Sequence, residues 1–139
     1  MLIGHYVPML VFGCLGQVVP ERVMAACGSP MWGMNQSGVR EGGKPYANMF
    51  FYNGGMGANT QRDGVTCLSW PSNVSSTSIE ISEHIAPLRF HHKALRPDSG
   101  GPGRHRGGLG QEILIESLSD SAIAVSFLAE RTIFAAFGI

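Results

Sequence analysis

The sequence contains few charged residues and no excess of either sign. Charged side chains make up 14% of the 139 residues, and ten basic residues balance ten acidic ones. In soluble domains about a quarter of the residues are charged, and proteins that bind nucleic acid or a membrane surface usually have a clear excess of basic residues. The composition therefore predicts neither a nucleic-acid nor a membrane partner. It also predicts an apolar surface that is covered by other protein.

Cysteine is scarce and forms no recognisable pattern. The three cysteines, Cys14, Cys27 and Cys67, include no C-x-x-C pair and leave an odd thiol under any pairing. The apolar run at residues 7–19 is too short to span a bilayer and lacks the basic leader of a signal peptide. These features predict a reduced, cytoplasmic protein.

The order of apolar and glycine-rich segments predicts one α+β domain over residues 1–139. Apolar residues at helical spacing predict a helix at residues 5–27, and the Gly- and Ser-rich stretch 28–45 predicts an ordered loop. Residues 46–139 form the β-rich part, with strand-like runs at 46–52, 65–70, 78–83, 88–95, 111–117 and 122–128. We expect an N-terminal helix followed by a mostly antiparallel sheet with long Gly-rich loops.

The most informative segment is the loop at residues 96–110. It contains six glycines, two prolines, three arginines and an Asp-Ser pair between two strand-like runs. Such a loop costs backbone entropy and adds little to a core, so we expect it to serve a site. Residues 98–102 resemble the nucleophile segment of trypsin-like proteases, but no upstream histidine has the setting of those enzymes. We therefore expect Ser99 to shape a turn rather than to act as a nucleophile.

Two glycine-rich loops supply candidate binding residues. Gly54, Gly55 and Gly57 allow consecutive backbone amides to face an anion or a substrate carbonyl, although a wide hairpin loop closed by Asp63 would use the same residues. In the second loop, the arginines surround Asp98 and are able to clamp a carboxylate-like anion bidentately. The alternative is that Asp98 pairs with them only to order the loop. These arginines are Arg96, Arg104 and Arg106.

Titratable residues give weaker signals. A strand at 78–83 would place Glu83 at the end of an apolar row as an acid–base group, unless it reaches solvent or pairs with Arg89. The histidines at 84, 91, 92 and 105 meet no metal-ligand spacing, so we predict no metal in this segment. No Gly-x-x-x-x-Gly-Lys-Ser/Thr motif is present, which assigns any ATP chemistry to another polypeptide.

Several separated motifs together resemble the hydantoinase B/oxoprolinase family, from about His5 to the last residue. The resemblance is specific because the motifs agree in order and spacing, which a single Gly-Gly-x-Gly would not establish. They are Gly54-Gly55-Met56-Gly57-Ala58, Asp63-Gly64, Pro71-Ser72-Asn73, Ile79-Glu80-Ile81-Ser82-Glu83, Pro87-Leu88-Arg89 and the segment from Leu95 to Gly110.

The resemblance implies a function in ATP-dependent ring opening of a cyclic amide such as hydantoin or 5-oxoproline. A hydantoinase A-like subunit would bind ATP and phosphorylate the amide oxygen, and the B-like subunit would complete the hydrolysis in a hetero-oligomer. The alternatives are a B-like subunit of an acetone- or acetophenone-type carboxylase, or a non-catalytic portion at a subunit interface. The resemblance further implies a piece truncated at both ends, with any divalent metal held in a more N-terminal region.

The residues expected to form the site fall into two groups. The expected catalytic residues are Glu83, Asp98, Arg104 and Arg106. The expected substrate-binding residues are Gly54, Gly55, Gly57, Asp63, Arg96, Gly100 and Gly101.

Overall fold

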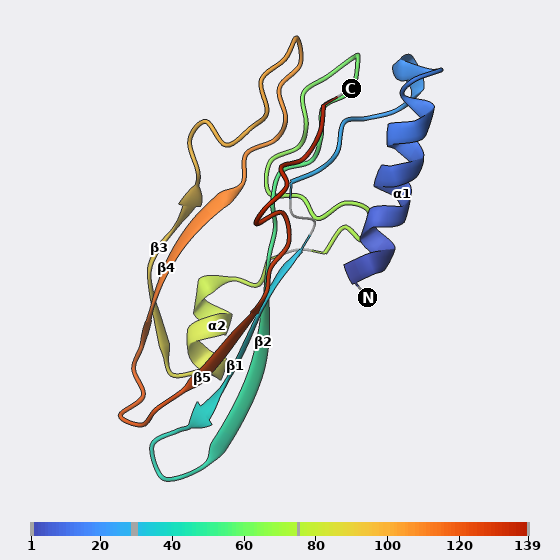
Figure 1. The fold of residues 1–139 in the computed structure, drawn as a ribbon. Helices are drawn as coiled ribbons and strands as arrows, with labels where there is room; N and C mark the ends of the chain where they lie inside the picture. The colour runs from blue at the N-terminus through green and yellow to red at the C-terminus, as the bar shows by residue number, and fades with distance from the viewer. Residues whose placement is uncertain (1, 29–30, 75, 139) are drawn as a thin grey trace.

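The computed structural model describes residues 2–28, 31–74 and 76–138, and this part of the chain has the expected α+β architecture (Figure 1). The helices and strands follow one another as α1 (Leu2–Leu15), the 3-10 helix η1 (Pro20–Arg22), β1 (Trp32–Val39), β2 (Pro45–Tyr52), α2 (Ile79–Ile85), β3 (Leu88–Leu95), β4 (Gln111–Ser117) and β5 (Ala124–Leu128). None of the described helices is long and apolar enough to cross a membrane.

The strands form two antiparallel sheets. In the first sheet β1 lies between β2 and β5. The pairing of β1 with β5 joins segments that are about ninety residues apart in the sequence. In the second sheet β3 pairs with β4, and the register shifts between Phe90 and His92. The long loop at residues 96–110 therefore connects two paired strands and extends beyond them (Figure 1).

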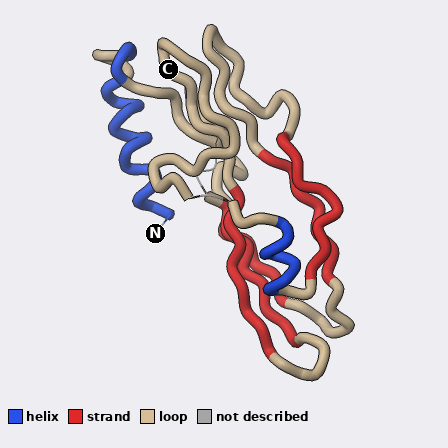
Figure 2. Tube along the Cα trace, turned by 180° about the vertical axis from the view of Figure 1, so that it is seen from behind, coloured by secondary structure: helices blue, strands red, loops and turns tan. Residues whose placement is uncertain are grey.

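Two apolar clusters hold the elements together. The first joins the two sheets and the end of α2, and it consists of Met34, Tyr46, Phe50, Ala86 and Leu88. The second fixes α1 to the segment that follows it, and it consists of Met9, Met24, Ala26 and Cys27. Loop segments fill the space between α1 and the strands (Figure 2). The site is built from these loops.

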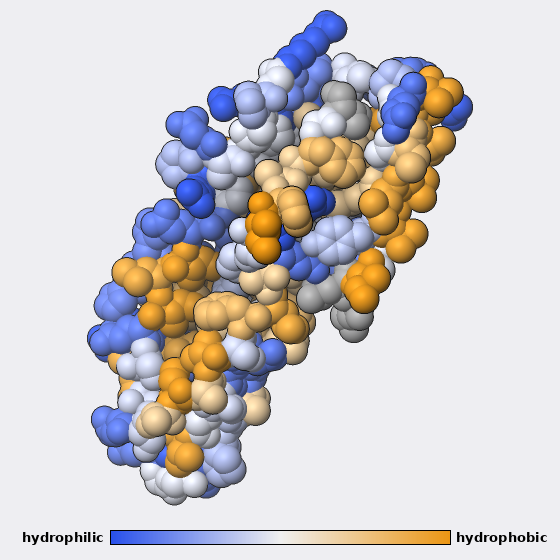
Figure 3. Space-filling model, viewed as in Figure 1, coloured by the Kyte–Doolittle hydropathy of each residue, from blue (hydrophilic) through white to orange (hydrophobic). Residues whose placement is uncertain are grey.

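The outer face of α1 is apolar as well as its inner face. Figure 3 shows apolar side chains gathered along this helix, and Ile3, Val7, Leu10 and Val11 are all exposed. Only the face that carries Met9 packs against the rest of the described chain. The low charge of the sequence thus corresponds to apolar side chains on the surface.

The prediction of a strand at residues 78–83 is wrong, because Ser78 caps the helix α2 and the following residues form it. The Ser78 hydroxyl accepts a hydrogen bond from the backbone N–H of Ile81 at 3.3 Å, which caps the first turn of the helix. A short alternating run does not distinguish a strand from one face of a short helix. In this segment the Ser78 cap and the buried Ser82 accompany the helix rather than the strand.

Three further predicted segments differ from the structure. Residues 32–39 form the central strand β1 inside the stretch predicted as loop, because pairing on both sides compensates for a sequence rich in Gly, Asn, Gln and Ser. Residues 65–70 form turns rather than the predicted strand. The helix predicted at 5–27 extends from Leu2 to Leu15 and is followed by the separate helix η1 at Pro20.

Candidate functional site

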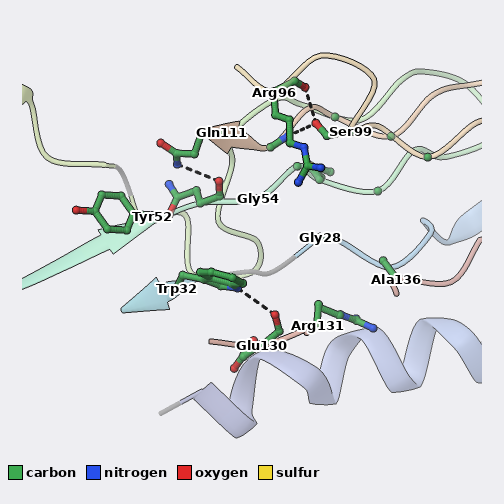
Figure 4. Close-up of a pocket in the computed structure, with 18 of the residues that line it drawn as sticks. Gly28, Trp32, Tyr52, Gly54, Arg96, Ser99, Gln111, Glu130, Arg131 and Ala136 are labelled. Carbon is green, nitrogen blue, oxygen red and sulfur yellow. Dashed lines mark hydrogen bonds between the residues drawn. The ribbon is translucent and has the colours of Figure 1, made fainter. Parts of the chain in front are cut away.

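One broad hollow of about 1200 Å³ lies where the two glycine-rich loops meet the sheets and the C-terminal segment. Residues Gly54, Gly55 and Gly57 line one part of it, and Arg96 and Arg104 line another. In Figure 4 the Arg96 side chain points into this space, and Trp32, Gly28 and Arg131 lie across from it. A concave site with apolar walls and few convergent polar groups is typical of small-molecule binding.

Two of the three loop arginines are available to a ligand. Within the described residues, the guanidinium groups of Arg96 and Arg104 have no hydrogen-bond or ion-pair partner, although both residues line the hollow. Arg106 differs, because its Nη2 lies 3.8 Å from the Asp98 carboxylate and it does not line the hollow. An unpaired guanidinium beside a cavity favours an anionic ligand.

The glycines at 54–57 form a wall of closely packed backbone. The Gly55 carbonyl accepts from the Gly28 amide at 2.8 Å, and the Met56 carbonyl accepts from the Gly108 amide at 2.9 Å. A Cβ atom on Gly55 would collide with the carbonyl oxygen of Gly108, and one on Gly57 would collide with that of Ala25. These glycines are therefore required where three loop segments approach one another, and a ligand in the hollow meets backbone at this wall.

Cys27 lies behind the glycine wall and is fully buried. Burial raises the pKa of its thiol, and a hydrogen bond from the Gly57 backbone opposes this shift only in part. A thiol with a raised pKa is a poor nucleophile at neutral pH. Cys27 therefore acts as a packing residue and not as a reacting group.

Ser99 has the turn-forming role expected of it. Its hydroxyl donates to the Arg96 carbonyl at 2.7 Å and accepts from the Gly110 amide at 2.9 Å. The Arg96 amide also donates to the Gly110 carbonyl at 2.9 Å, which continues the pairing beyond β3 and β4. These bonds fix the position from which the Arg96 side chain enters the hollow.

Asp63, rather than Asp98, ties the arginine loop to its neighbour. The Asp63 carboxylate accepts from the Arg106 backbone amide at 2.9 Å and lies 3.4 Å from His105 Nδ1. Asp98 has 93% of its side chain exposed, and within the described residues its carboxylate has only the 3.8 Å contact to Arg106. Neither carboxylate lines the hollow. Asp63 thus orders the loop without facing a ligand.

Glu83 lies on α2, away from the hollow. Its carboxylate accepts from the Phe90 backbone amide at 2.7 Å and joins α2 to β3. The alternative pairing with Arg89 is wrong, because Arg89 lies 3.6 Å from the Glu116 carboxylate. Gly100 also lies outside the lining and packs against the Gly107 carbonyl, whereas Gly101 faces the hollow.

Nothing in the sequence indicated that Trp32, Glu130 and Arg131 form the wall of the hollow opposite the glycine loop. The Trp32 indole N–H donates to the Glu130 carbonyl at 3.0 Å, and the Tyr6 hydroxyl donates to the Glu130 carboxylate at 2.8 Å. Arg131 lies over the Tyr6 ring, 5.4 Å from its centroid. These contacts join residues about a hundred positions apart, so no local pattern predicts them.

The described residues contain no group of three or more His, Cys, Asp or Glu side chains able to hold a metal ion. His91 instead pairs with Glu116, its Nε2 lying 2.8 Å from the carboxylate.

Comparison with known proteins gives consistent results. The sequence profile of the family described as Hydantoinase B/oxoprolinase matches residues 1–139. The chain is 34% identical over 125 residues to the beta subunit of caprolactamase from Pseudomonas jessenii, covering 81% of this chain and 20% of the relative. It is 29% identical over 127 residues to the B subunit of a putative D-/L-hydantoinase from a Pseudomonas species, strain NS671, covering 88% of this chain and 20% of the relative.

A solved structure shares the fold. The nucleotide-free structure of acetone carboxylase superposes with a TM-score of 0.67 and 24% sequence identity, covering 80% of this chain and 15% of that chain. At this identity the likeness shows the fold alone. The chain spans about a fifth of the length of the curated relatives described above.

Proposed function

Because the chain belongs to the hydantoinase B/oxoprolinase family, we propose that it forms part of a hydrolase subunit for the ATP-dependent ring opening of a cyclic amide. The names of two relatives support this substrate class, since caprolactam and hydantoin are both cyclic amides. Both relatives are named as subunits, which supports a hetero-oligomer with a second kind of subunit. By the family resemblance, that second subunit would be of the A type and would bind ATP. The free thiols of Cys14, Cys27 and Cys67 support a cytoplasmic location.

The proposed chemistry explains why a site for an anion is needed. A cyclic amide resists hydrolysis because resonance makes its carbonyl carbon a weak electrophile. Phosphorylation of the amide oxygen by the A-type subunit would convert that oxygen into part of a leaving group, so that water attacks a more electrophilic carbon. The activated intermediate carries the negative charge of a phosphate, which must be stabilised until it leaves.

One observation supports this role most strongly: Arg96 and Arg104 line the same hollow as the glycine wall at 54–57 and have no anionic partner among the described residues. A guanidinium binds phosphate oxygens bidentately, while the glycine wall lets the ring approach the backbone. The proposal therefore assigns anion binding to Arg96 and Arg104. It leaves Glu83, Asp98 and Arg106 outside the reacting groups.

The two alternatives have less support. The likeness to acetone carboxylase concerns the fold alone and does not favour a carboxylase. A purely structural role at a subunit interface would not require unpaired arginines to face a hollow. The proposal places ATP on the A-type subunit and any divalent metal in a more N-terminal region of the full-length subunit.

Reconstitution tests the proposal. A full-length subunit that contains these 139 residues is mixed with its A-type partner and ATP, and ring opening of hydantoin, 5-oxoproline and caprolactam is followed together with ADP release. We expect ATP-dependent opening of at least one ring and no activity from the 139-residue chain alone. Carboxylation of a ketone without ring opening would support the carboxylase alternative instead.

A further inference from the structure

His105 lies between two arginines of the glycine-rich loop and lines the same hollow as Arg96 and Arg104. Its side chain is only 27% exposed, and its Nδ1 atom lies 3.4 Å from the Asp63 carboxylate. Within the described residues the other ring nitrogen, Nε2, has no hydrogen-bond or ion-pair partner. One nitrogen of the ring is therefore next to a carboxylate, and the other is free for a ligand.

Asp63 holds the imidazole from outside the hollow. The same carboxylate oxygen that lies near His105 accepts a hydrogen bond from the Arg106 backbone amide at 2.9 Å, which fixes its position. The Arg106 side chain does not compete for this oxygen, because its guanidinium lies near Asp98 instead. A carboxylate beside one ring nitrogen orients the imidazole and compensates its charge when the ring is protonated.

The other charged residues of the lining leave the hollow positive. Figure 4 shows Glu130 and Arg131 across the space from Arg96. The Glu130 carboxylate accepts from the Tyr6 hydroxyl, and Arg131 lies over the Tyr6 ring, so both side chains contact α1. The guanidinium groups of Arg96 and Arg104 are without a partner among the described residues. No carboxylate of the lining is therefore paired with the two free arginines.

We propose that His105 is a third anion-binding residue of the hollow, which contacts the anion through its protonated Nε2, and that Asp63 is its positioning residue. The inference rests on the proposed function, because it adds a ligand to the same anion site. Two guanidinium groups and one imidazolium can serve the three terminal oxygens of a phosphoryl group, whereas a carboxylate offers only two oxygens. The preferred ligand is therefore a phosphoryl group, and its affinity depends on pH.

Sulfate is a probe that separates His105 from the charge of the ligand, because it remains a dianion throughout the range in which imidazole titrates. Isothermal titration calorimetry on the full-length subunit measures sulfate affinity at about pH 5.5 and about pH 8.5, at constant ionic strength. We expect binding about tenfold weaker at the higher pH. His105→Gln should bind weakly at both pH values. His105→Lys should bind tightly at both, because lysine keeps its charge.

The matched control is His91→Gln, because His91 pairs with Glu116 and does not line the hollow. This variant should keep the pH dependence of the natural sequence, and thermal melting should show that all variants fold. Equal sulfate affinity at both pH values in the natural sequence, no measurable binding, or a pH dependence that persists in His105→Gln would overturn the inference.

Ring opening by the complete complex separates this inference from the proposed function. A complex that opens the ring while its sulfate affinity ignores His105 would overturn the inference and leave the proposed function intact. Sulfate binding that depends on His105 in a complex that opens no cyclic amide would support the inference and contradict the proposed function.

Discussion

Tyr6 and Tyr52 differ in whether the phenol hydroxyl has a hydrogen-bond partner, and this difference changes the effect of each hydroxyl on the stability of the fold. Burial is the main cause that raises the pKa of each phenol to about 12. The Tyr6 hydroxyl donates to Glu130 at 2.8 Å, whereas the buried Tyr52 hydroxyl has no hydrogen-bond partner in the described chain. An unpaired buried hydroxyl costs about 1–3 kcal/mol, while a hydrogen bond to a charged group stabilises a fold by about 1.5–3 kcal/mol.

Replacing each tyrosine with phenylalanine should therefore have opposite effects. We expect Tyr52→Phe to raise the free energy of unfolding by about 1 kcal/mol, because it removes the unpaired hydroxyl and keeps the ring. Tyr6→Phe should lower it by a similar amount, because it leaves Glu130 without its donor. Urea unfolding measures both changes. Equal losses in the two variants would show that Tyr52 has a partner after all.

The same phenols predict the response to alkaline pH. Each pKa in the folded state lies above the ordinary value of 10, so folding favours the neutral phenol. This contribution to stability is complete below pH 10 and is lost as the pH rises from 10 through 12. Urea midpoints should fall over that range, and Tyr52→Phe should make the fall shallower. An unchanged slope in that variant would contradict the assigned pKa.

At the scale of loops and strands, backbone contact replaces side-chain packing around the hollow. Gly55, Gly64 and Gly108 each lie against a carbonyl group of a neighbouring segment, and a Cβ atom on any of them would collide with it. Backbone bonds such as Met56 to Val65 at 2.9 Å and Gly64 to Arg106 at 2.8 Å connect these segments. The loops are thus a layered scaffold, not flexible connections.

Gly55→Ala should destabilise this layer. The added methyl must push the Gly108 backbone away, and overpacking of this kind costs about 1–3 kcal/mol. Gly101→Ala is the control, because it lies in the partner loop with nothing within 4 Å of the added atom. Thermal melting should show a clear drop for Gly55→Ala and little change for Gly101→Ala. Similar melting temperatures in both variants would contradict the layered packing.

The sequence predicted those elements whose signal is local. The hairpin strands β3 and β4, the strand β2 and the turn role of Ser99 all follow from patterns within a few residues. It failed for β1, whose polar sequence becomes a central strand only because β2 and β5 pair with it. It also failed for α2, where the Ser78 cap outweighs an alternating pattern.

For the candidate site, the sequence identified the two loops but not the function of each residue in them. Asp98 stood nearest to the arginines along the chain, yet Asp63 forms the bonds that order the loop. Trp32, Glu130 and Arg131 complete the opposite wall through contacts between distant parts of the chain. Such contacts depend on tertiary packing, which single-sequence patterns do not contain.

For the whole molecule, the central claim is that the hollow binds an anionic intermediate through Arg96 and Arg104. The most direct measurement is the kinetics of ATP-dependent ring opening by the complete complex that carries Arg96→Lys. Lysine keeps the charge but loses the planar fork, so kcat/KM should fall about tenfold or more while the melting temperature stays constant. Arg89→Lys is the control, because Arg89 pairs with Glu116 outside the hollow. Unchanged kinetics in Arg96→Lys and in the double variant Arg96→Ala/Arg104→Ala would contradict the account.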